Sequence, residues 1–123
     1  MLGMFARMAE TLDLSGDQRA QVKAILRSHA AEIEAQLTDG AAARRALHDA
    51  IRAQPLDEAA IRARAAEAGV VHANGAVLFA KIRAEVLPIL TADQKQKLQS
   101  LDERMGRKDR GAKAFADFLR SDS

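Results

Sequence analysis

Leu14-Ser15-Gly16-Asp17-Gln18 returns later in the chain as Leu90-Thr91-Ala92-Asp93-Gln94, so the pattern Leu-Ser/Thr-x-x-Gln occurs twice. A Ser or Thr hydroxyl at a helix start accepts a hydrogen bond from an amide of the first turn, and a Gln three residues later reaches back to the amide of the cap. Because no helix satisfies these first amides by itself, the pattern predicts two helix starts. One such arrangement, called a capping box, is common in helical proteins, whereas two boxes with the same Leu and the same Asp-Gln ending are a more specific signal.

The composition is that of an all-α protein with a single domain. Ala is the most frequent of the 123 residues, Gly and Pro number 7 and 2, and aromatic residues make up 3% of the chain. Leu, Ile, Val and Phe together form less than a quarter of it, which is a thin supply for one compact core. We therefore expect helices that pack closely through Ala, and a fold that a second copy completes in a homodimer.

Charge and residue content argue against several functional classes. The formal net charge is +2, and the pI of about 9.3 reflects only a small excess of Lys and Arg, so nucleic acid is not an expected partner. The chain has no Cys, no Gly-x-Ser-x-Gly setting and no phosphate-binding glycine loop, so we expect neither an enzyme nor a required cofactor. No apolar run is long enough to span a membrane.

Apolar periodicity predicts about four helices, of which the first two precede a proline break. The first runs from the Ser15 cap to about Leu37, and Thr38-Asp39-Gly40 is expected to end it because Gly is a common helix terminator. The second covers about residues 41–53. The segment Gln54-Pro55-Leu56 then interrupts the helical pattern.

The third predicted helix is the longest and covers about residues 57–89. The apolar and small residues on one of its faces, which we call the seam, recur in heptad-like steps of three and four residues. Gly69 and Gly75 favour a bend in the middle of this helix. The fourth helix begins at the Thr91 cap. We expect a single helical domain over residues 1–123, with its core at 12–105 and a basic, partly mobile tail at 106–123.

Three segments together resemble a known family: the paired boxes, residues 44–51 (Arg-Arg-Ala-Leu-His-Asp-Ala-Ile) and residues 89–95 (Ile-Leu-Thr-Ala-Asp-Gln-Lys). They are similar to the Spy/CpxP-like periplasmic stress proteins, often called the LTxxQ family, which includes a ZraP-like and CnrX-like metal-resistance branch. The resemblance covers roughly residues 12–105, and the first box departs from the pattern with Ser15 in place of Thr. It implies a long bent helical hairpin that dimerises into a thin cradle.

The resemblance also implies a location and two functions. These proteins act in the periplasm of Gram-negative bacteria, so a signal peptide would already have been removed from this chain. The chaperone branch holds unfolding proteins on the concave face of the cradle without ATP, and the metal branch binds divalent cations through His, Glu and Met. A third class is a regulatory protein that docks on an envelope-stress or metal sensor protein.

The chaperone interpretation needs apolar side chains beside charges, because such a surface binds unfolded chains weakly and promiscuously. For the four apolar candidates, packing in the core of the hairpin or dimer is the alternative that we place first, whereas Arg44 and Arg45 are expected to be exposed. The candidate client-binding residues are Arg44, Arg45, Leu47, His48, Ile51, Arg52, Phe79 and Ile82.

The metal interpretation is the alternative function, with zinc, nickel, cobalt or copper as the bound ion. The chain has three histidines but no His-x-x-x-His pair, so for each of them we place an ordinary solvated or hydrogen-bonded side chain first. Two candidates three residues apart share a helix face, and one lies on the long seam, where it is able to approach its copy in a dimer. The candidate ligands are His29, Glu32, His48, His72 and Met105.

Overall fold

The structure is a computed structural model that describes the backbone of residues 3–106 and 110–121 and the side chains of residues 7–104 and 115–121. This part of the chain is almost entirely helical and contains no strand, which confirms the all-α prediction. Its elements are α1 (Gly3–Thr11), α2 (Gly16–Ser28), α3 (Ala30–Arg52), α4 (Glu58–Val86), the 3₁₀ helix η1 (Leu87–Ile89), α5 (Ala92–Gly106) and α6 (Arg110–Arg120).

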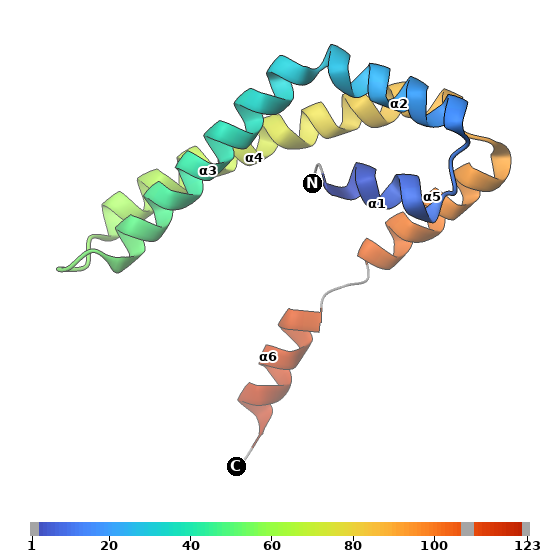
Figure 1. Ribbon diagram of the computed structural model, residues 1–123. Coiled ribbons are helices and arrows are strands. Elements are labelled where there is room, and N and C mark those ends of the chain that lie inside the picture. Colours follow the sequence, from blue (N-terminus) through green and yellow to red (C-terminus); the bar gives the residue numbers. More distant parts are fainter. Residues whose placement is uncertain (1–2, 107–109, 122–123) are drawn as a thin grey trace.

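The helices form a long hairpin with a broader base (Figure 1). One arm consists of α2 and α3, the other arm is α4, and the packing of α3 against α4 is the most extensive in the described residues. Residues 53–57 connect the arms at the tip. At the opposite end, which we call the base, the chain turns through η1 into α5, and side chains of α1 and α5 belong to the same core. None of the described helices is long and apolar enough to cross a membrane.

Both predicted capping boxes are present. The Ser15 amide donates to Gln18 Oε1 at 2.9 Å, and the Gln18 amide donates to Ser15 Oγ at 3.2 Å. Thr91 and Gln94 repeat the arrangement with the same distances of 2.9 Å and 3.2 Å. The repeated motif therefore starts α2 and α5, as the sequence predicted.

The two boxes also bind each other. Gln18 Nε2 donates to Gln94 Oε1 at 2.7 Å, and Gln94 Nε2 donates to Gln18 Oε1 at 3.0 Å. The same two nitrogens reach backbone carbonyls as well, that of Ile89 at 3.1 Å from Gln18 and that of Leu12 at 3.3 Å from Gln94. The motif is thus a tertiary contact that ties the start of α2 to the start of α5.

The core lies at the base, whereas the rest of the hairpin consists only of its two arms packed side by side. Ile82 and Val86 of α4 are among its most deeply buried side chains, whereas α3 has no buried residue at all. A single copy therefore has a small core, in agreement with its modest supply of large apolar side chains. The buried apolar residues of the described part are Met8, Leu12, Leu14, Val22, Leu78, Ile82, Val86, Leu90 and Leu98.

The predicted end of the first helix at residues 38–40 was wrong. Helix α3 continues through Gly40 to Arg52, and the boundary between the first two helices lies at His29 instead. A Gly inside a helix costs only about 1 kcal/mol relative to Ala, and the three alanines that follow Gly40 favour continuation. At His29 the backbone leaves the helical region, with φ −104° and ψ 14°. Figure 1 shows the change of direction at this joint.

The predictions for the second half of the chain were closer. Helix α4 and η1 together cover the predicted long helix, and α4 runs without interruption through Gly69 and Gly75, whereas the other arm is broken into two helices at His29. Asp57 caps α4, because its Oδ1 accepts from the Ala60 amide at 3.1 Å. Pro88 lies in η1, where the α-helical hydrogen bonding ends.

We expect Gln94→Ala to lower the free energy of unfolding by about 2–3 kcal/mol. The substitution removes the oxygen that accepts from the Thr91 amide at the start of α5, and it deprives the Gln18 carboxamide and the Leu12 carbonyl of a partner. Urea unfolding followed by circular dichroism measures the effect. Gln96→Ala, at an exposed position of the same helix, is the matched control and should change stability by less than about 0.5 kcal/mol. In a double-mutant cycle with Gln18→Ala, additive losses would contradict the direct pairing.

Candidate functional site

A groove of about 240 Å³ lies between the two arms of the hairpin. Its lining is mostly apolar and includes no acidic residue, and its charged members are Arg44 and, when protonated, His72. Helix α3 contributes Gln36, Leu37, Gly40, Ala43 and Arg44, and α4 contributes Ala68, Val71, His72, Gly75, Leu78 and Phe79.

The arms approach each other closely at Gly75. Gln36 reaches across from α3, and its Nε2 donates to the Val71 carbonyl of α4 at 2.9 Å. A Cβ atom placed on the buried Gly75 would lie 2.5 Å from that nitrogen, which is closer than real contacts allow. The absence of a side chain at residue 75 therefore makes room for the Gln36 bridge beside the groove.

Two of the predicted client-binding residues lie together in the structure, and a third is buried and therefore not available to a client. Arg44 and Phe79 line the same groove from opposite arms. Ile82 is fully buried at the base, so it takes the core role that the sequence left open. Helix α3 carries the remaining five closer to the tip: Leu47 is half-buried, and the exposed ones are Arg45, His48, Ile51 and Arg52.

Sequence reasoning missed Leu37 as a groove residue. It assigned Leu37 to the last turn of a helix that ended before Gly40, which separated it from Arg44. In the continuous α3 these residues are seven apart and lie on the same side of the helix, and both line the groove. The seven-residue spacing was the signal that could have found the pair.

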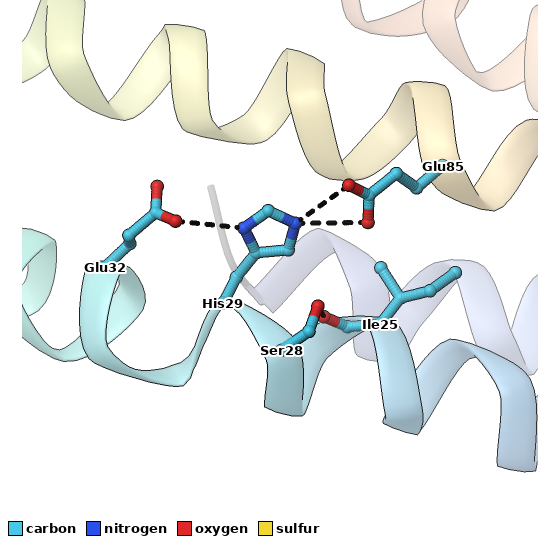
Figure 2. A network of polar contacts seen from close by, with 5 residues as sticks. All are labelled: Ile25, Ser28, His29, Glu32 and Glu85. Atoms are coloured by element: carbon cyan, nitrogen blue, oxygen red, sulfur yellow. Dashed lines mark hydrogen bonds and ion pairs between the residues drawn. The ribbon is translucent and has the colours of Figure 1, made fainter.

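A second polar cluster surrounds the joint between α2 and α3 (Figure 2). The largely buried ring of His29 lies between two carboxylates. Its Nδ1 is 3.3 Å from Glu32 of α3, and its Nε2 is 3.1 Å and 3.2 Å from the two oxygens of Glu85 of α4. Beside it, Ser28 Oγ donates to the Ile25 carbonyl at 2.6 Å, at the last turn of α2.

The carboxylates raise the pKa of His29 above its ordinary value of 6.5, with the hydrogen bond to Glu85 as the largest cause and that to Glu32 as the next. A protonated imidazole donates from both nitrogens, whereas a neutral one donates from a single nitrogen. Both contacts are therefore complete only when His29 carries a positive charge. Protonated His29 then joins the two arms of the hairpin through Glu85.

The predicted metal ligands do not come together as one centre. His29 and Glu32 are in contact, but His48 is exposed on α3, His72 lines the groove, and the side chain of Met105 lies outside the described residues. No group of three or more His, Asp or Glu side chains with the geometry to hold a metal ion occurs in the described part of the chain. Even at His29 the two glutamates lie on opposite sides of the ring.

Glu85 was not among the predicted site residues. It is 56 residues from His29 along the chain, so no local spacing connects the two. Only the antiparallel register of the arms brings them together.

We expect stability to fall as the pH rises through the pKa of folded His29. Because that pKa is raised by folding, the stabilisation is fully present below about 6.5 and is lost as the ring deprotonates in the folded protein. Thermal midpoints across this pH range, compared between wild type and His29→Ala, isolate the effect. His48→Ala, at an exposed position of α3, is the matched control. An unchanged pH dependence in His29→Ala would show that the cluster does not stabilise the fold.

Comparison with known proteins assigns a family. A family model described as heavy-metal resistance matches residues 1–97, which is more than three quarters of the chain. Neither the search of curated proteins nor that of solved structures gave a match. The matched region includes both capping boxes, both arms of the hairpin and the groove, and it ends within α5. The chain therefore belongs to the heavy-metal resistance family, the group of Spy/CpxP/ZraP-like proteins that its paired boxes indicated.

Proposed function

We propose that this protein is an ATP-independent periplasmic chaperone that holds unfolded or misfolded proteins as a homodimer. The groove between the arms is the observation that carries the proposal. It offers an apolar lining with a positive charge at Arg44, and it lies between the two arms, with one end reaching the core at Leu78.

The chemistry of the groove suits segments of unfolded chains. Apolar side chains of a client gain free energy by leaving water on contact with Leu37, Val71 and Phe79. Arg44 attracts client carboxylates and keeps the surface from being uniformly apolar. A groove of about 240 Å³ accommodates side chains rather than a folded domain, so each contact is weak and reversible, and release requires no nucleotide.

The thinness of the arms supports a homodimer. Helix α3 has no buried residue, and Val77 of α4 is exposed although it does not line the groove. A second copy that covers such side chains would increase the buried apolar area without closing the groove. Sedimentation at micromolar concentration tests the homodimer, and a monomer alone would contradict this part of the proposal.

We expect Leu37→Ser to weaken client holding while Val70→Ser does not. Both side chains are exposed to a similar degree, 59% for Leu37 and 61% for Val70, but only Leu37 lines the groove. The protein concentration that halves the aggregation of a denatured client should rise about fivefold for Leu37→Ser. Equal effects of the two substitutions would count against the groove. No suppression by wild type at several-fold molar excess would contradict the chaperone function itself.

Divalent-metal binding at His29 is the second candidate, and the family description favours it. Imidazole and carboxylate are common ligands of zinc, and His29 lies within 3.3 Å of both Glu32 and Glu85. A zinc ion there would use one ring nitrogen and the glutamate beside it, together with ligands from water or a second copy.

Calorimetric titration with Zn²⁺ tests this candidate. We expect a binding heat and a higher thermal midpoint for wild type and for His48→Ala, and neither for His29→Ala. Binding should weaken at low pH, because protons compete with the metal for the ring. A flat titration of the wild-type protein at micromolar concentration would remove metal binding as a function.

A further inference from the structure

Helix α6 presents an apolar face that no other part of the described chain covers. Figure 1 shows α6 away from the hairpin, and no extensive helix packing in the described residues involves it. Phe115, Phe118 and Leu119 are all exposed, with Phe118 at 73%. Their i, i+3, i+4 spacing places them on one face of the helix. Among the described side chains, these three are the large exposed apolar ones that lie outside the hairpin.

The basic charge of the protein is concentrated in the same region. Residues 104–123 contain six Lys and Arg against three Asp and Glu, whereas residues 1–103 contain thirteen against fourteen. The end of the chain is therefore positive and the rest slightly negative. The matched family region ends at residue 97, so this basic, amphipathic segment lies beyond the part that the family model describes.

The charge of the groove argues against it as the place where α6 docks. Arg44 and His72 are its only lining residues that carry charge, and both are cationic when charged. A basic helix has no acidic counterpart there, in its own copy or in another copy of the chain. An anionic lipid surface, in contrast, complements α6 in both respects, because it offers acyl chains to an apolar face and phosphates to basic side chains.

We propose that α6 binds an anionic lipid surface and lies in the plane of the interface. Phe115, Phe118 and Leu119 would enter the boundary between headgroups and acyl chains, and the exposed Arg120 would contact the phosphates. A helix of 11 residues is about 16 Å long, which is enough to lie on a bilayer and too short to span one. The contact holds the hairpin beside a membrane whether or not a client is bound.

Flotation of the full 123-residue protein with lipid vesicles tests this inference. We expect binding to vesicles that contain phosphatidylglycerol, little binding to pure phosphatidylcholine, and release at high salt. Phe118→Asp should weaken partitioning by about tenfold or more. Leu56→Asp is the matched control, because Leu56 is 70% exposed, close to the 73% of Phe118, but lies at the tip of the hairpin. Arg120→Glu should also weaken binding, whereas Arg62→Glu on α4 should not.

Three results would overturn the proposal. The first is the absence of wild-type protein from the floating fraction with anionic vesicles, and the second is an equal loss in Phe118→Asp and Leu56→Asp. The third is a change of oligomeric state in Phe118→Asp with unchanged vesicle binding, which would mean that the face packs on protein. Because Phe118 lies outside the core, thermal midpoints should be the same for wild type and Phe118→Asp, so none of these results would be confused with unfolding.

Discussion

The paired carboxamides of Gln18 and Gln94 are the interaction on which the rest of the structure depends. Each accepts from the backbone amide of the residue that caps its helix, binds the other Gln, and donates to a backbone carbonyl of a further segment. A buried polar network stabilises a fold only when its members are satisfied, and here both amides are fully used. The pair fixes where α2 and α5 begin relative to each other, and the base core forms around it. The arms extend from this anchored end.

The sequence predicted the local features of this arrangement and missed those that join distant segments. The caps at Ser15, Asp57 and Thr91 were predictable because the hydroxyl or carboxylate and the amide that it accepts from are three residues apart. The contact between Gln18 and Gln94 spans 76 residues, so no local pattern indicates it. Gly40 misled the prediction because a weak helix former was taken as a terminator, although neighbouring alanines and the packing against α4 outweigh its cost.

In the candidate site, too, the sequence predicted the local features and missed the contacts between distant segments. Arg44 and Phe79 were predicted from a mixture of apolar and basic residues, and the structure places both in one groove. Gln36 and Glu85 were missed, because their roles depend on the register between the arms, with a bridge to Val71 in one case and a contact with His29 in the other. Register of this kind depends on how α3 and α4 pack along their length, which is the most extensive helix packing in the described residues.

The lack of any buried residue in α3 implies that resistance to opening is graded along the hairpin. Local unfolding follows the density of buried apolar contacts, and these are concentrated where α2 and α4 meet α1 and α5. Backbone amides near residues 50–60 therefore exchange their hydrogens with solvent long before those around Ile82 and Val86. The loop at the tip, which joins two helix ends with no core beneath it, is for the same reason the part of the hairpin where we expect proteolytic cleavage. The tip of the hairpin is therefore expected to unfold locally while the base remains folded.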